Sequence, residues 1–170
     1  MTLASSTIGL VIGIVQLIIA IIFAVIALYI GYSVLGKITK GIDEQKELAK
    51  GNVAVGIIVA AVFFAIAIVV QSGVAGIGVG FSRAMAAGFM SVDGFIAIGV
   101  ALLQLIIGII LAVAAIYLAL NILDRLTKGV EEFEEIKKGN VAVALMMAGV
   151  IVAVALIIQS GVIGITSALI

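Results

Sequence analysis

The chain has 170 residues, of which 65% are hydrophobic and 11% are charged, and its mean hydropathy is +1.50. Soluble domains are about half apolar and about a quarter charged, so this composition excludes an ordinary water-soluble fold. Net charge is zero, which gives no reason to expect nucleic acid as a partner. The chain has no Cys and no His, which excludes disulfides and removes the commonest metal ligand and general base. We therefore expect no metal, no cofactor and no catalytic residues, and a function other than that of an enzyme.

Four apolar segments are each long enough to cross a bilayer, at about residues 8–35, 53–77, 95–123 and 141–165. A spanning helix needs about 20 predominantly apolar residues. The first segment is too long, and too uncharged at its start, to be a cleavable signal peptide, so we interpret it as the first span. The pattern predicts an all-α fold, namely an integral membrane four-helix bundle.

A Gly-Asn pair stands directly before the second and the fourth segment, as Gly51-Asn52 and Gly139-Asn140. Gly is well suited to end the preceding helical turn, and Asn is a favourable N-cap for the helix that follows. We expect this helix-start motif to be structural.

The connection between the second and third segments contains two further signals. The glycines within residues 73–80 predict the end of the second helix. In residues 81–94, the spacing of Phe81, Met85 and Phe89 places them on one helical face. This spacing predicts either a short helix in the membrane interface or a plain tight connection.

An internal repeat with a period of 88 residues organises the chain. The sequence GNVAV occurs at residues 51–55 and again at residues 139–143. The repeat divides the chain into two hairpin units, residues 1–82 and residues 83–170. Because each unit has two spans, it returns to the side on which it started, and the second unit repeats the first in the same direction. We expect two parallel hairpins related by an axis along the membrane normal.

The basic residues predict how the chain is oriented in the membrane. The joining segment contributes only Arg83, and the N-terminal tail contributes no Lys or Arg. The two hairpin loops carry the others, Lys37, Lys40, Lys46, Lys50, Arg125, Lys128, Lys137 and Lys138. By the positive-inside rule, both loops are cytoplasmic and both termini lie outside, in the inner or plasma membrane of a cell.

Small residues follow one face of the first and third segments. In the first segment they form the Gly13 stripe, made of Gly13, Ala20, Ala24 and Ala27, and in the third the Ala101 stripe, made of Ala101, Gly108, Ala112 and Ala115. Small residues at these spacings let helix backbones approach closely within a membrane.

The second and fourth segments each have two faces of small residues. The Gln face consists of Gly56, Ala60, Ala67 and Gln71, repeated as Ala144, Ala148, Ala155 and Gln159. The Ser face consists of Ala54, Ala61, Ala65 and Ser72, repeated as Ala142, Gly149, Ala153 and Ser160. Two such faces on each helix predict contacts on two sides. One chain of four helices satisfies only part of them, and the remainder favours a homo-oligomer.

Four glutamines lie within the spans, namely Gln16, Gln71, Gln104 and Gln159. Counted at about 1.5 Å per residue from the cytoplasmic ends, they should form one layer in the outer half of the bilayer. An unpaired amide facing lipid costs roughly 1–3 kcal/mol, so we expect these side chains to face other helices or water. The layer either hydrogen-bonds between helices or lines a constriction for an ion or small solute.

A polar loop followed by Gly-Asn-Val-Ala, with a Gln inside the preceding span, resembles the domain-of-unknown-function 350 family of small bacterial and archaeal inner-membrane proteins. The residues that carry the resemblance are Gln16, Gly51, Asn52 and Ala54, and their copies Gln104, Gly139, Asn140 and Ala142. The resemblance covers nearly the whole chain. It implies paired membrane hairpins and no particular activity.

Three hypotheses for function follow. The leading one is a structural membrane protein whose partners are the lipid bilayer and itself, forming a homo-oligomer or array through its small-residue faces. The alternative is an ion or small-solute channel or transporter whose path runs through the glutamines. A further alternative is a membrane subunit that recruits a soluble partner through its charged loops.

Overall fold

A computed structural model describes residues 3–39, 41–88, 90–126 and 131–168. Within these ranges the chain forms six α-helices and no strands. The helices are α1 (Leu3–Ile38), α2 (Glu44–Ala49), α3 (Val53–Ala87), α4 (Val92–Leu126), α5 (Glu132–Lys137) and α6 (Val141–Ala168). The four long helices contain the candidate spans Gly9–Ser33, Val53–Ala87, Val92–Leu118 and Val141–Gly164. The prediction of an all-α membrane bundle with four spanning helices is confirmed.

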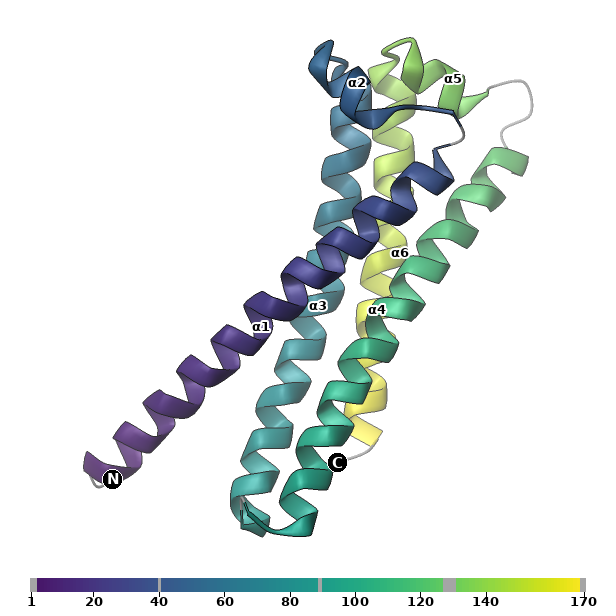
Figure 1. The fold of residues 1–170 in the computed structure, drawn as a ribbon. Helices are drawn as coiled ribbons and strands as arrows, with labels where there is room; N and C mark the ends of the chain where they lie inside the picture. Colours follow the sequence, from purple (N-terminus) through teal and green to yellow (C-terminus); the bar gives the residue numbers. More distant parts are fainter. Residues whose placement is uncertain (1–2, 40, 89, 127–130, 169–170) are drawn as a thin grey trace.

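The two hairpins run in the same direction (Figure 1). α1 runs to the end of the molecule where α2 lies, and α3 returns to the opposite end. α4 and α6 follow the same course, with α5 between them at the end where α2 lies. We call the end with α2 and α5 the loop end, and the opposite end, with both termini and the α3–α4 connection, the terminal end. Two predicted loop residues, Lys40 and Lys128, lie outside the described residues.

The helix starts follow from their capping residues. Asn52 caps α3, because its side chain accepts hydrogen bonds from the N–H groups of Ala54 and Val55. At the terminal end, the Ser91 hydroxyl accepts a hydrogen bond from the Gly94 N–H at 3.0 Å, so α4 begins immediately after Ser91.

The glycine-rich stretch at residues 73–80 does not end the second helix, and that prediction is wrong. α3 continues to Ala87, where the turn at Gly88 ends it. The glycines instead let α4 lie close to α3. A Cβ on Gly80 would lie 2.7 Å from the Cβ of Ala101 and 3.0 Å from the Ala97 carbonyl oxygen. Close approach of two backbones is the packing that glycine permits in membranes.

The alternative of a separate interfacial helix at residues 81–94 is also wrong. Residues 81–87 form the last turns of α3, and α4 starts at Val92. A tight connection joins the two helices, with Phe89 outside the described residues.

α3 lies at the centre of the molecule. It packs against α1, α4 and α6, and α4 also packs against α6. Of the most apolar stretch of α3, 61% is buried inside the molecule, whereas only 6% of the corresponding stretch of α1 is buried. α1 lies against α3 near the loop end and diverges from the other three helices toward its N-terminus (Figure 1). The bundle is therefore open on the side that α1 leaves.

Candidate functional site

The short helix α2 ends in a turn that requires glycine. Gly51 has a φ of 78°, a conformation that side chains disfavour. Its N–H donates to the Leu48 carbonyl at 2.9 Å. The N–H of Asn52 donates to the Glu47 carbonyl at 3.0 Å. This pair of bonds is a Schellman motif, which satisfies the last carbonyls of a helix.

Asn52 completes this turn and starts the next helix. Its Oδ1 accepts from the Ala54 N–H at 3.1 Å and the Val55 N–H at 3.3 Å. Its Nδ2 donates to Glu47 Oε2 at 3.1 Å. One side chain therefore fixes the angle between α2 and α3.

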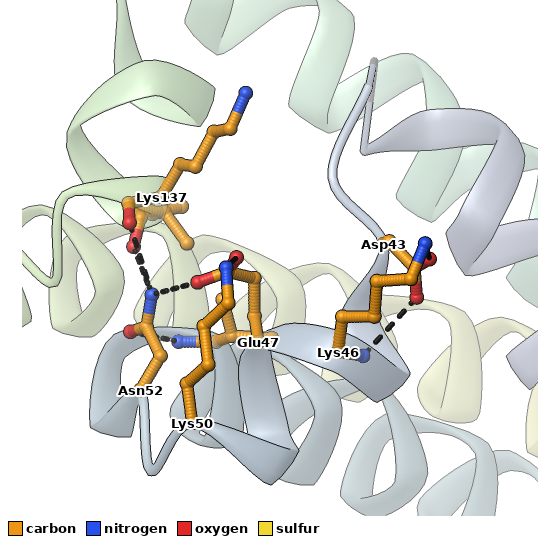
Figure 2. A network of polar contacts seen from close by, with 8 residues as sticks. Asp43, Lys46, Glu47, Lys50, Asn52 and Lys137 are labelled. Carbon is orange, nitrogen blue, oxygen red and sulfur yellow. Dashed lines mark hydrogen bonds and ion pairs between the residues drawn. The ribbon is translucent and has the colours of Figure 1, made fainter.

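Glu47 joins the same network from the last turns of α2 (Figure 2). Lys50 Nζ donates to Glu47 Oε1 at 2.6 Å. The hydrogen bond from Lys50, and then that from Asn52, hold the pKa of Glu47 below its ordinary value of 4.5. The ionised form of Glu47 is thus the one that the fold favours.

The second repeat contains the same network. Gly139 has a φ of 89°. Asn140 Nδ2 donates to Glu135 Oε2 at 2.9 Å, and Lys138 Nζ donates to Glu135 Oε1 at 2.8 Å. The hydrogen bond from Asn140, followed by that from Lys138, lowers the pKa of Glu135.

One contact of the first network crosses to the second repeat. Asn52 Nδ2 also lies 3.1 Å from the carbonyl oxygens of Ile136 and Lys137, at the end of α5 (Figure 2). The Ile136 carbonyl also accepts from the Gly139 N–H at 2.9 Å, so Asn52 adds a donor from the first hairpin to the turn that ends α5. In the described part of the chain, Asn140 makes no equivalent contact with the end of α2.

A second difference between the repeats concerns a glutamate at the start of each short helix. Glu44 accepts a hydrogen bond from the Thr39 hydroxyl. Its copy, Glu132, is 1% exposed, and among the residues that the structure describes neither of its carboxylate oxygens has a hydrogen-bond partner. The copy of Thr39 is Thr127, which lies outside the described residues.

Two of the glutamines, Gln16 and Gln104, lie on α1 and α4. Gln16 is half-buried, and a Cβ on Gly78 of α3 would lie 3.7 Å from its Nε2. Gln104 is also half-buried and lines a small pocket with Ile107, Gly108, Leu111 and Val162. The pocket measures about 30 Å³, above the roughly 10–15 Å³ that a cavity needs to hold one water molecule.

The other two glutamines differ in their surroundings. Gln159 on α6 is half-buried, and its Nε2 lies 3.5 Å from the carbonyl oxygen of Ile68 on α3, at the long limit of a hydrogen bond. Gln71 on α3 is exposed on the surface of the single chain.

The small-residue stripes of α1 and α4 are buried to different extents. Ala101, Gly108 and Ala112 are buried, and Ala115 is half-buried. On α1, Ala27 is buried and Ala20 and Ala24 are half-buried, whereas Gly13 is exposed with nothing within 4 Å of an added Cβ. α1 therefore uses its stripe only toward the loop end.

The polar side chains of the loop end hold helices together. In the ranges that the structure describes, no group of three or more Asp and Glu side chains could hold a metal ion. The loop end brings together amides, backbone carbonyls and Glu–Lys pairs, which fix helix ends in place.

Sequence reasoning identified the Gly-Asn pairs but missed their partners Glu47, Lys50, Glu135 and Lys138. The signal was present, because both loops read Glu-x-x-Lys-Gly-Asn at the repeat offset. The contact of Asn52 with α5 could not be read from the repeat, since only one repeat makes it in the described residues.

The comparisons with known proteins agree with this architecture. The family model described as Domain of Unknown Function (DUF350) matches residues 8–111 and residues 90–170. The two matched segments together cover nearly the whole chain, as expected for a duplicated unit. No curated protein and no solved structure matches the chain. The chain is an integral membrane protein with four apolar helices, and it belongs to the DUF350 family.

Proposed function

We propose that this protein is a structural, self-associating membrane protein whose work is to build a homo-oligomer or array. We also propose that the membrane is the inner or plasma membrane of a cell, with the loop end cytoplasmic. The basic residues of the hairpin loops support this orientation.

The observation that carries the proposal is the unused part of the Gly13 stripe. Gly13 on α1 and Ala101 on α4 occupy the same position in the two repeats. Ala101 is 3% exposed beneath α3, whereas Gly13 is exposed with open space around it. A helix face that packs in one repeat and is bare in the other indicates a partner outside the single chain.

Membrane physics gives this face a reason to pair. Lipid tails are as apolar as the helices, so association depends on close van der Waals contact and hydrogen bonds between helices. Small residues permit that contact. The same face carries Gln16. Acyl chains offer no hydrogen-bond partners for its amide, whereas another helix can.

The test is to fill the space at Gly13. Gly13→Leu should leave the single chain folded, because nothing lies within 4 Å of the added Cβ. We expect it to shift the purified protein in mild detergent from an oligomer toward the 17.3 kDa single chain, measured by light scattering.

The matched control is Gly99→Leu on α4. Gly99 is equally exposed and has equally open surroundings, but it lies outside the Ala101 stripe. It should remain oligomeric. An unmodified protein that is a single chain would overturn the proposal, and a Gly13→Leu protein that assembles normally would remove this face from the contact.

Conduction through the glutamines is one of the two other functions that the sequence leaves open, and a flux assay separates it from assembly. Assembly through small-residue helix faces requires no path for ions across the membrane. Liposomes that contain the protein should therefore retain an ion gradient. Leakage that Gln16→Leu with Gln104→Leu abolishes would favour conduction instead.

A further inference from the structure

We infer that copies of this chain join head to tail, by repeating between chains the contact that the two hairpins make within one chain. The Ser face of α6 in one copy receives the Gln face of α3, together with α1, of the next copy. This inference rests on the proposed self-association and specifies its interface.

The first evidence is that each repeat uses a different small-residue face. On α3 the Ser face is buried, with Ala54 and Ala65 at 0% exposure. On α6 the Gln face is buried instead, with Ala144 and Ala155 at 0% exposure.

The two faces that remain are both exposed. On α3 the Gln face is uncovered at Ala60, Ala67 and Gln71, and on α6 the Ser face is uncovered at Ala142, Gly149, Ala153 and Ser160. Each chain thus leaves one face of each kind unused.

The contact between α3 and α6 therefore pairs unlike faces. The bond from Gln159 to the Ile68 carbonyl locates it, since Ile68 lies between Ala65 and Ser72 on the Ser face of α3. A two-fold arrangement would pair the same face from both helices. A pairing of unlike faces is heterologous, and it can continue from copy to copy.

The second evidence is the contact between α3 and α4. A Cβ on Gly73 would lie 2.2 Å from Leu105 Cδ1, so these helices touch at this level. The copies of these positions are Gly161 on α6 and Leu17 on α1. Both are exposed, and an added Cβ on Gly161 meets nothing within 4 Å. The α1 helix of a second copy would restore the missing contact.

The third evidence comes from the polar contacts between the two hairpins. Residues of one hairpin make each contact, and the corresponding residues of the other hairpin lack it. Gln159 is placed against α3, whereas its copy Gln71 is exposed. Asn52 reaches the carbonyls that end α5, whereas Asn140 has no such contact in the described residues. Repetition of the interface would bring Gln71 of the next copy to Leu156, and Asn140 to the carbonyls that end α2 of that copy.

The geometry has a consequence for the assembly. Successive hairpins point the same way, so every copy keeps its loop end on one side of the membrane. A heterologous contact closes into a ring if its rotation permits, and otherwise grows as an open row. Because each copy adds two hairpins, a closed ring contains an even number of them.

The test uses cysteine cross-linking, which is clean here because the natural chain has no Cys. A chain with Gly161→Cys and Leu17→Cys should form intermolecular disulfides on oxidation in membranes, seen as a ladder on a non-reducing gel. Each single variant should remain uncross-linked. A mixture of the two single variants should yield dimers and nothing larger.

The matched control is Gly73→Cys with Leu105→Cys, which places the same pair inside one chain. The ideal Cβ at Gly73 lies 3.2 Å from Leu105 Cβ, so a small separation of the helices reaches the roughly 3.5–4.5 Å of a disulfide. This variant should form an intramolecular disulfide and no ladder.

The outcomes separate this inference from the proposed function. A protein that is oligomeric by mass, forms the control disulfide, and gives no ladder with the 17/161 pair would overturn the head-to-tail interface while leaving self-association intact. Disulfide dimers from either single variant would indicate a two-fold contact and also overturn it. A single-chain mass for the unmodified protein would overturn both proposals.

Discussion

A single asparagine at the start of α3 ties three segments together at the loop end. The Asn52 side chain caps α3, binds Glu47 of α2 and reaches two carbonyls of α5. Its copy Asn140 caps α6 and binds Glu135, but reaches no third segment in the described residues. Both asparagines therefore start a helix, but in the described residues only Asn52 also connects the two hairpins.

This difference predicts unequal effects of the same substitution in the dissociated single chain. Loss of an Asn cap costs about 0.5–2 kcal/mol, so Asn140→Ala should lower stability by that amount. Asn52→Ala loses the cap and the bonds to α5, and should cost about 1 kcal/mol more. Chemical unfolding in a detergent that separates the subunits measures both. Equal losses would show that the α5 contact contributes nothing.

The Glu–Lys pairs of the same networks predict a pH dependence. The pKa of Glu47 and that of Glu135 are lowered from 4.5 in the folded state, so their ionised forms stabilise the fold above that pH. As pH falls below 4.5 and through the lowered pKa values, this contribution is lost. Thermal unfolding should therefore shift to lower temperature on acidification.

The control for this prediction is the variant with Glu47→Gln and Glu135→Gln, which cannot titrate at these positions. It should be less stable than the unmodified protein at neutral pH and lose less on acidification. An identical acid-induced shift in both proteins would assign the effect to other carboxylates.

At the scale of the helices, glycine acts in two ways that the sequence alone does not separate. The Gly51 turn was predictable, because Asn and an apolar segment follow it directly. The glycines at residues 73–80 suggested a helix end, yet α3 runs through them to Ala87. Only the position of α4 reveals their use, since Gly80 lies against Ala97 and Ala101.

Packing at Gly80 predicts a large effect from a small substitution. In Gly80→Ala the added Cβ would lie 2.7 Å from Ala101 Cβ and 3.0 Å from a backbone oxygen, so the helices must separate. We expect a loss of about 1–3 kcal/mol, as for other overpacked interfaces. Gly99→Ala, at an open position on the same pair of helices, should be neutral. Unfolding of both variants in detergent measures the difference, and two equally stable variants would refute close packing at Gly80.

At the scale of the whole molecule, the repeat predicted the fold well. Four spans and two hairpins that run in the same direction followed from segment length and from the 88-residue period, because an even number of crossings returns the chain to its starting side. The sequence also identified the two small-residue faces of α3 and α6.

The sequence could not predict which face each helix uses inside the chain. The faces are nearly identical in the two repeats, so the choice depends on neighbours rather than on composition. α3 has a following hairpin, against which it packs its Ser face, whereas α6 is the last helix in the described chain and leaves that face uncovered. α1 diverges from the other three long helices toward its N-terminus, so most of its apolar surface is uncovered in the single chain (Figure 1).

An image of single particles of the intact assembly in lipid is the most direct test of this account. We expect a ring or row in which the loop ends share one side of the membrane and α6 of each copy lies beside α1 and α3 of the next. Isolated four-helix chains, or dimers in which α1 meets α1 across a two-fold axis, would contradict it.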